Sequence, residues 1–425
     1  MIGIVLALVG FVILHLVSGK DRVEGRFTVV WVLQSAYTLR LILQSFLRDI
    51  PFFSHGAGGD CMTYEFYGQL IATEWEHTGV HYVTGSEFDS RVLTQTSLPM
   101  NVFGMVIYLN GGPTRLGCTA IVALCACLTC YNLYLLALEL GASQPFAFKV
   151  MVLTLFGPAI LMYTSDTYKD GFVALFTTAA VGYAFRLAHR FSWRQACFAA
   201  LCLFGLWQVR YYLVFVSVLP LIVGITGLKS RTIWRPLAVC GVLCAIGAAT
   251  VGYSQVLETA AEKAEDAFTM GTSEVVVQDN ATGGSGVTFN DGGRAFGAFG
   301  PKVAYMLFSP FPWQSGSIGF QIGKLDALIW YYLAYRAFVG ARRLLRENIA
   351  LLLMFLIFLL PVVVAYSASM SNIGLIVRQR IPLVLICALL ATLSEPAPRT
   401  QEGPEEAPGS DREASFAAGS TAAVH

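Results

Sequence analysis

The apolar stretch LGCTAIVALCACLTCYNLYLLAL, residues 116–138, contains no charged side chain and decides the class of this fold. At a rise of about 1.5 Å per helical residue it is long enough to cross about 30 Å of hydrocarbon. The whole chain has the same character, because 56% of its 425 residues are hydrophobic and only 13% are charged. This is about half the charged share of an ordinary soluble domain. The sequence therefore predicts an all-α polytopic membrane protein.

Apolar stretches of similar character recur along the chain. About eleven transmembrane helices are expected, at 2–18, 27–47, 116–138, 148–163, 171–187, 195–208, 211–227, 236–253, 326–341, 349–367 and 380–394. They form one transmembrane domain, 1–394, and the Pro-, Glu- and Ser-rich segment 395–425 is predicted to be a disordered cytoplasmic tail. With 28 basic and 27 acidic residues, no basic excess indicates a nucleic-acid partner.

The distribution of basic residues predicts the orientation in the membrane, because Lys and Arg in short loops stay cytoplasmic. Four basic clusters should share the cytoplasmic face, at 20–26, 186–194, 229–235 and 342–346. The N-terminus is then outside, the C-terminus is cytoplasmic, and two large loops, 48–115 and 254–325, lie on the outer face. The short apolar stretch 98–109 is interpreted as an interfacial helix, since counting it as a span would invert every later loop.

The first outer loop contains the segment GGDCMTYEFYGQ, residues 58–69, directly after the second predicted helix. Asp60 is a candidate general base that takes a proton from an attacking hydroxyl. Tyr64, at helical spacing from it, could face a lipid headgroup. The plainer alternative is a solvated loop acid that caps a short helix, and spacing alone favours that reading.

A second polar segment, TSDTYKD at residues 164–170, lies between two predicted helices. Polar residues are costly beside hydrocarbon unless they are paired or hydrated. Asp166 or Asp170 could therefore orient an acceptor, and Lys169 could contact a phosphate. An ordinary capped turn explains the segment equally well.

Three arginines, Arg210, Arg378 and Arg380, lie at the outer boundary, where the positive-inside rule disfavours them. Guanidinium groups suit bidentate phosphate recognition. The alternative is that each arginine only extends toward anionic headgroups, which explains one such residue more easily than three. Arg40, inside the second predicted helix, is expected to pair within the bundle.

No metal site is predicted. His55, His77 and His81 lack the close helical spacing of a zinc motif. Most cysteines lie in or beside apolar runs, so intramolecular disulfides are not expected.

These features together resemble the GT-C superfamily of integral membrane glycosyltransferases, which includes protein mannosyltransferases and lipid A aminoarabinose transferases. The resemblance covers roughly 28–190, and its matching elements are Gly59-Asp60 with Tyr64, the segment Pro99 to Gly111, the run 116–138 leading into Glu139, Phe156-Gly157-Pro158, Tyr163-Thr164-Ser165 and Lys169-Asp170. The resemblance implies that Asp60 is the catalytic base and that Asp166 or Asp170 assists it. Family members often carry adjacent acids in the first loop, whereas Cys61 follows Asp60 here.

The expected function is transfer of a sugar from a polyprenyl phosphate or pyrophosphate donor to a saccharide, lipid or protein acceptor. Nucleotide sugars are not available outside the bacterial inner membrane, where cell-surface polysaccharides such as exopolysaccharides are completed. Lys169, Arg210, Arg378 and Arg380 would stabilise the leaving phosphate. No soluble cofactor is required, and a divalent cation is compatible but not indicated. Two alternatives stay open, a repeat-unit polysaccharide polymerase and a non-enzymatic lipid-oligosaccharide translocator, which should place ionisable groups deep within several helices.

Overall fold

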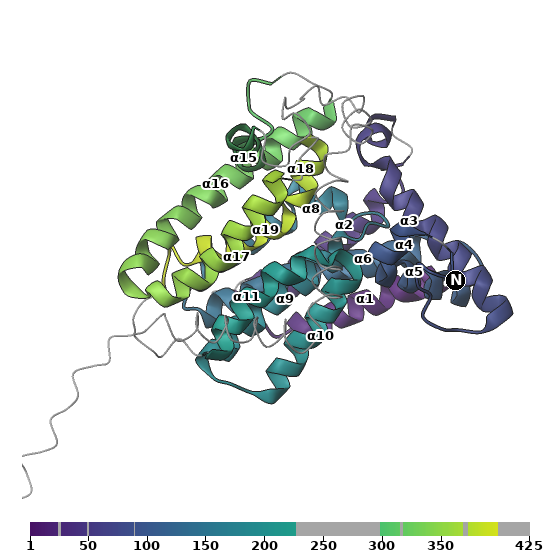
Figure 1. The fold of residues 1–425 in the computed structure, drawn as a ribbon, viewed down its shortest axis with the longest axis horizontal. Coiled ribbons are helices and arrows are strands. Elements are labelled where there is room, and N and C mark those ends of the chain that lie inside the picture. Colours follow the sequence, from purple (N-terminus) through teal and green to yellow (C-terminus); the bar gives the residue numbers. More distant parts are fainter. Residues whose placement is uncertain are drawn as a thin grey trace, which may run out of the picture.

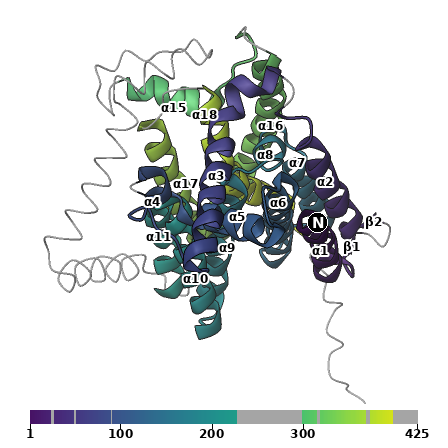
Figure 2. The ribbon, with the colours of Figure 1, turned by 90° about the vertical axis from the view of Figure 1, so that its right-hand side faces the viewer.

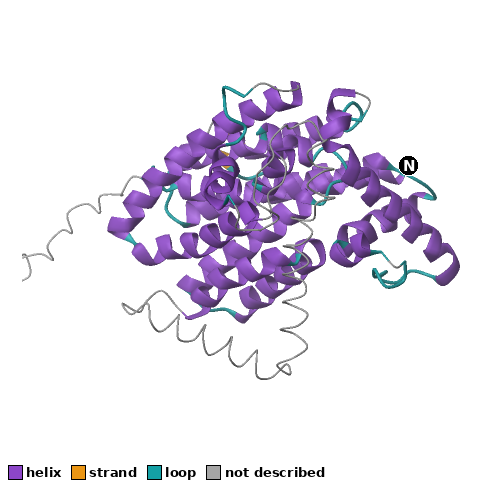
Figure 3. Ribbon diagram, turned by 45° about the horizontal axis from the view of Figure 1, so that its top comes forward, coloured by secondary structure: helices purple, strands orange, loops and turns teal. Residues whose placement is uncertain are grey.

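The computed structural model describes residues 1–23, 27–48, 51–88, 90–226, 298–314, 318–368 and 373–397. Almost every ribbon in Figure 3 is helical. The exception within the described residues is a short antiparallel hairpin of β1 (Arg22–Val23) and β2 (Phe27–Thr28). The structure is thus compatible with an all-α membrane protein.

The helices are labelled in Figure 1. In chain order they are α1 (Ile2–Ser18), α2 (Val29–Leu43), α3 (Pro51–Thr78), α4 (Arg91–Gln95), α5 (Ser97–Asn110), α6 (Arg115–Glu139), α7 (Gln144–Leu155), α8 (Pro158–Tyr163), α9 (Asp170–His189), α10 (Trp193–Arg210), α11 (Tyr212–Thr226), α15 (Phe299–Phe308), α16 (Ile318–Glu347), α17 (Ile349–Ala368), α18 (Ile373–Gln379) and α19 (Ile381–Thr392).

Three described helices, α6, α9 and α17, are long and apolar enough to cross a membrane. Shorter apolar helices occur at α1, α2, α7, α11 and α19. The predicted number of eleven spans stays a prediction, and the predicted span 236–253 lies outside the described residues. Helices α6 and α9 pack side by side, and α16 packs along α19, as Figure 1 also shows.

One predicted span is interrupted, and another begins directly after a helix break. The span expected at 148–163 breaks between α7 and α8 at Gly157, because Pro158 has no N–H and disfavours helical backbone in the preceding residue. The span expected at 380–394 belongs to a longer segment that breaks at Arg380, between α18 and α19, with Pro382 in the first turn of α19. Conversely, α16 extends beyond the expected 326–341 at both ends.

The predicted outer loop 48–115 is largely helical. Figure 2 shows α3 upright beside α5, and the two helices pack closely. Glycines permit this contact, since a Cβ at Gly104 would lie 2.7 Å from the Ile71 side chain and one at Gly68 3.0 Å from that of Phe103. The expected helix at 98–109 is α5, and its buried residues include Met100 and Phe103.

Helix α9 spans the distance between two ends of the molecule. Its 20 residues extend about 30 Å. Asp170 begins the helix. Near the other end, Arg186 donates from Nε and Nη2 to Glu139, each at 2.8 Å. We call the first end the Asp170 end and the second the Arg186 end.

The described residues of three of the four predicted basic clusters lie at the Arg186 end. Besides Arg186, Gln144 after α6 donates to the carbonyl of Arg22 at 2.9 Å, and Arg343 donates to the carbonyl of Leu393 at 2.9 Å. Residues 394–397 join these elements, because the Ser143 N–H donates to the carbonyl of Glu395 at 2.8 Å. The fourth cluster, 229–235, and tail residues 398–425 lie outside the described residues.

Candidate functional site

The turn between α8 and α9, together with the first residue of α9, carries four buried polar residues that bond to arginines from elsewhere in the chain, and one of them, Thr167, accepts from Arg48 at 2.9 Å. Thr164 accepts from Arg40 of α2 at 2.8 Å, Asp166 pairs with Arg48 and Asp170 pairs with Arg378. These four polar residues are at most 2% exposed. An ordinary solvated turn does not bury two carboxylates, so the segment organises the Asp170 end.

Arg378 connects two of the predicted catalytic acids. Its Nε donates to Oδ2 of Asp170 at 2.6 Å, and its Nη1 donates to the carboxylate of Asp60. Arg210, the last residue of α10, donates from Nη2 to Oδ1 of Asp170 at 3.4 Å. Residues from α3, α9, α10 and α18 therefore meet around one guanidinium. We call Asp60, Lys169, Asp170, Arg210 and Arg378 the Asp60 cluster.

The cationic side chains of this cluster keep unused hydrogen-bonding capacity. Nη2 of Arg378 and Nη1 of Arg210 are buried and make no hydrogen bond within the described residues. Lys169 donates from Nζ to Oγ1 of Thr96 at 3.0 Å and forms no salt bridge with a described carboxylate. Buried donors without partners are unfavourable, and an anionic ligand would satisfy them.

The surrounding charges shift the pKa values of Asp60 and Lys169. Burial would raise the pKa of Asp60, but Arg378, Lys169 and Arg210 outweigh this effect and hold that pKa below its ordinary value. The Asp60 side chain is 52% exposed, so solvent can reach it. Burial, followed by repulsion from Arg210 and Arg378, lowers the pKa of Lys169 to about 7. Asp60 is thus ionised at rest, and Lys169 can change its charge near neutral pH.

Aromatic rings line the cationic groups. The Arg378 guanidinium lies 5.1 Å from the ring centroid of Tyr168 and 5.7 Å from that of Tyr163. Lys169 Nζ lies 5.5 Å from the ring centroid of Tyr64. Ring faces attract cations, so these contacts offset part of the cost of burying charge. Tyr64 was predicted to face a headgroup, whereas the structure places it 4% exposed beside Lys169.

A second charged network adjoins the first. Arg48, which follows α2, donates from Nε and Nη2 to the two oxygens of Asp166 at 2.8 and 2.7 Å. Its Nη1 lies 2.7 Å from Oε2 of Glu65. Asp170 shares Arg378 with Asp60, whereas Asp166 is bound by Arg48, so Asp170 is the better placed of the two acids predicted to assist Asp60. Our sequence reasoning missed Arg48 and Glu65, although an arginine at the predicted outer end of a span was a usable signal.

Arg380 lies apart from the cluster, contrary to its predicted phosphate-binding role. Its Nη1 donates to the carbonyl of Ser309 at 2.7 Å, and its Nη2 donates to Oδ2 of Asp326 at 3.4 Å. The Arg380 side chain is 0% exposed. Arg378 lies in α18 and Arg380 at the break that follows it, and positions two apart on helical backbone differ by about 200° of rotation, so the two side chains reach different partners. Asp326, an acid at the start of a predicted span, was not among the predicted site residues.

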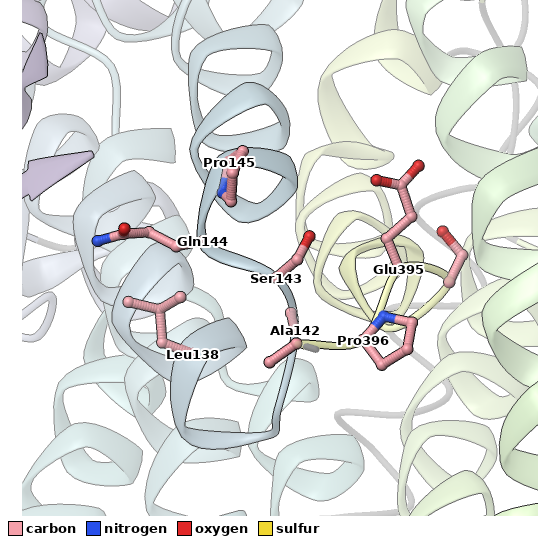
Figure 4. A pocket seen from close by; sticks show the side chains of 9 residues that line it. Leu138, Ala142, Ser143, Gln144, Pro145, Glu395 and Pro396 are labelled. Atoms are coloured by element: carbon pink, nitrogen blue, oxygen red, sulfur yellow. The ribbon is translucent and has the colours of Figure 1, made fainter. Parts of the chain in front are cut away.

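A hollow of about 690 Å³ lies at the Arg186 end, away from the cluster. Figure 4 shows Leu138 and Gln144 on one side of it and Glu395 and Pro396 on the other. It contains none of the predicted site residues. Within the described residues, no group of three or more His, Cys, Asp or Glu side chains is arranged to hold a metal ion, and none of the eight described cysteines forms a disulfide.

Comparison with known proteins gives no assignment: no family model, curated protein or solved structure matches this chain. The geometry of the Asp60 cluster is therefore the basis for any functional conclusion.

Proposed function

We propose that this chain is a GT-C-type membrane glycosyltransferase that moves a sugar from a polyprenyl-phosphate donor to an acceptor hydroxyl. It has about eleven spans in the bacterial inner membrane, with the Asp170 end outside and the C-terminus in the cytoplasm. The observation that carries this proposal is the environment of Arg378, which bonds a half-exposed carboxylate and a buried one and still has a free buried donor.

The donor phosphate occupies the space defined by Lys169, Arg210 and Arg378. Three cations outnumber the two carboxylates of the cluster, and the unpartnered Arg210 and Arg378 nitrogens supply hydrogen bonds to phosphate oxygens. Guanidinium groups bind such oxygens with directed pairs of N–H donors. Burial strengthens these interactions because water competes poorly for them.

The reaction needs one proton acceptor and a stabilised leaving group. Asp60 takes the proton of the acceptor hydroxyl, and the resulting oxygen attacks the anomeric carbon of the donor. The bond between that carbon and the phosphate oxygen breaks, and its electron pair leaves with the lipid phosphate. Arg210, Arg378 and Lys169 stabilise the added negative charge on this phosphate. Asp170 holds both arginines in place through contacts of 2.6 and 3.4 Å.

Donor binding and activation of the base are coupled through Arg378. At rest, Arg378 lowers the pKa of Asp60, which makes the carboxylate a weak base. A bound phosphate draws Nη1 of Arg378 away from Asp60, while Nε stays on Asp170. The pKa of Asp60 then rises toward its ordinary value, so the stronger base is present only when the donor is bound.

A repeat-unit polymerase would use the same side chains of the Asp60 cluster with a longer acceptor. The identity of the acceptor therefore distinguishes a polymerase from a transferase that adds a single sugar. A translocator would place ionisable groups along an open path. The fully buried Arg40 and Arg380 instead donate to protein carbonyl and side-chain oxygens, which favours a transferase over a translocator.

The experiment uses the full chain in phosphatidylcholine nanodiscs with a panel of polyprenyl-phosphate sugars and simple glycoside acceptors. Release of polyprenyl phosphate, followed by mass spectrometry, is expected for at least one donor. Arg378→Lys should lose most of that release, because lysine offers a point charge rather than a fork. Glu139→Gln, at the Arg186 end, is the matched control and should keep wild-type turnover. No release from any donor, together with no binding of polyprenyl phosphate, would overturn the proposal.

A further inference from the structure

The two interrupted helices meet at one buried ion pair. Asp326 of α16 accepts from the backbone N–H of Ala159, in the first turn of α8, at 3.0 Å. The other Asp326 oxygen accepts from Arg380, the residue at the break between α18 and α19. A single carboxylate therefore joins the start of α8 to the junction of α18 and α19.

Arg380 extends this junction to a third segment. It donates to the carbonyl of Ser309, which follows α15, at 2.7 Å. Its guanidinium also lies 5.5 Å from the ring centroid of Trp330, one helical turn after Asp326 on α16. Four helices, α8, α15, α16 and α18, are thus tied together around the pair.

The surroundings of the pair exclude a ligand. The neighbouring cavity, lined by Gly157, Asp326, Trp330 and other residues, measures about 10 Å³. That is room for about one water molecule. Because no space for a ligand lies beside this buried pair, its role is to hold the helices that it connects in place. One of these helices is the short helix α18, which carries Arg378.

We propose that Asp326 and Arg380 are positioning residues, which fix α18 and thereby hold Arg378 beside Asp60 and Asp170. Helix α18 has only seven residues, too few to be stable in isolation. It packs against α8 and α15, and it is anchored by Arg378 within its last turn and by Arg380 directly after it. Loss of the second anchor frees the helix, and Arg378 then no longer has a fixed position.

Hydrogen–deuterium exchange of the full chain in nanodiscs tests this role without any ligand. In Asp326→Asn the amide oxygen still accepts from Ala159, but the charge that holds Arg380 is lost. Exchange of the peptide covering 373–381 should therefore rise by about 3-fold or more, while the peptide covering 158–163 stays protected. Asp326→Ala should expose both peptides. Glu139→Ala is the control and should change neither.

The conservative variant Asp326→Asn separates positioning by charge from simple packing. Asn has nearly the size of Asp, so a packing role predicts that protection of 373–381 is unchanged in this variant. Positioning by charge predicts that protection is lost, because only the charge that holds Arg380 is removed. Unchanged exchange of 373–381 in Asp326→Asn would overturn the inference.

A binding measurement connects this positioning role with the proposed function. Only this measurement rests on the proposed function. A polyprenyl phosphodiester in the nanodisc should bind about 10-fold more weakly to Asp326→Asn than to wild type, in proportion to the loss of ordered Arg378. If wild type itself does not bind this probe, the proposed function fails, and the exchange data still decide whether Asp326 positions α18.

Discussion

Arg378 is the residue on which the Asp60 cluster depends, because one guanidinium serves two carboxylates with different exposure. Asp170 is buried and holds Nε, whereas Asp60 is half exposed and holds Nη1. A ligand can displace the second contact more easily than the first, since a solvent-accessible carboxylate loses less when its partner leaves. The cluster therefore has one fixed contact and one exchangeable contact.

Replacing Asp60 separates catalysis from binding. Asp60→Asn should reduce sugar transfer by about 10²-fold or more, as expected when a general base is lost. Binding of a polyprenyl phosphodiester should stay equal or become tighter, because the neutral amide competes less for Arg378. Titration of the probe into nanodiscs and a transfer assay measure the two effects. Full transfer by the variant would remove Asp60 from the mechanism.

Lys169 predicts a pH dependence of ligand binding. Its pKa of about 7 in the free protein lies below the ordinary lysine value, so the amine is neutral above this pH and charged below it. An anionic ligand favours the charged form, so binding above pH 7 takes up a proton. Affinity should then fall by up to about 10-fold per pH unit above 7. A phosphodiester is the appropriate probe because its charge is constant in this range.

Two variants check this pH effect. Lys169→Arg keeps its charge, so its affinity should vary little between pH 7 and 9. Lys169→Met should bind weakly with an equally flat profile. A wild-type profile as flat as that of Lys169→Arg would mean that Lys169 does not titrate with the ligand. The same pKa predicts that the unliganded protein gains stability as pH rises above 7, since the unfolded chain then binds more protons.

Individual elements differ in how far the sequence predicts them. Long apolar runs predict α6, α9 and α17 well, because burial in lipid and helical hydrogen bonding depend on local composition. The break at Gly157 was not expected, although Pro158 marks it, and helix α18 was not expected before the predicted start of the last span at residue 380. Proline and polar groups are tolerated inside a span only when distant residues satisfy them, and here Asp326 does so from α16.

The residues of the candidate site also differ in how far the sequence predicts them. Charges at the predicted outer ends of helices indicated Asp60, Lys169, Asp170, Arg210 and Arg378, because such charges are costly without a role. Partners far away in sequence were not predictable. Arg48 pairs with Asp166 across 118 residues and Arg380 pairs with Asp326 across 54, and only tertiary packing brings them together. Arg380 was grouped with Arg378 by proximity in the chain, although helical rotation separates their side chains.

The contact between α3 and α5 gives a prediction at the scale of elements. A Cβ at Gly104 would lie 2.7 Å from Ile71, so Gly104→Ala should destabilise the protein by about 1–3 kcal/mol through overpacking. Gly323 in α16 is the matched control, since a Cβ there would lie 3.4 Å from Pro310, an ordinary van der Waals contact. Gly323→Ala should be neutral or stabilising by up to about 1 kcal/mol. Thermal unfolding in nanodiscs compares the two, and equal midpoints would contradict close packing of α3 on α5.

At the scale of the whole molecule, charge is distributed between two ends separated by the length of α9. The Asp170 end holds charges that are buried and paired between helices. The Arg186 end holds more exposed pairs such as Arg343 with Glu347, which suit contact with water and anionic headgroups. This asymmetry agrees with the positive-inside rule if the Arg186 end is cytoplasmic. The proposed donor site would then face outward, where lipid-linked sugars are the available donors.

Labelling with a membrane-impermeant thiol reagent tests this orientation. Because Cys197 is exposed, the measurement uses a cysteine-free background that retains wild-type unfolding behaviour. Arg115→Cys, at the start of α6, marks the Asp170 end, and the exposed position Arg346→Cys marks the Arg186 end. The first should react in intact cells and the second only after permeabilisation, because an apolar layer about 30 Å thick separates them. Reaction of both from outside would mean that the helices do not span a bilayer in this arrangement. The reverse pattern would place the Asp60 cluster in the cytoplasm, where nucleotide sugars are available, and would remove the reason for a lipid-linked donor.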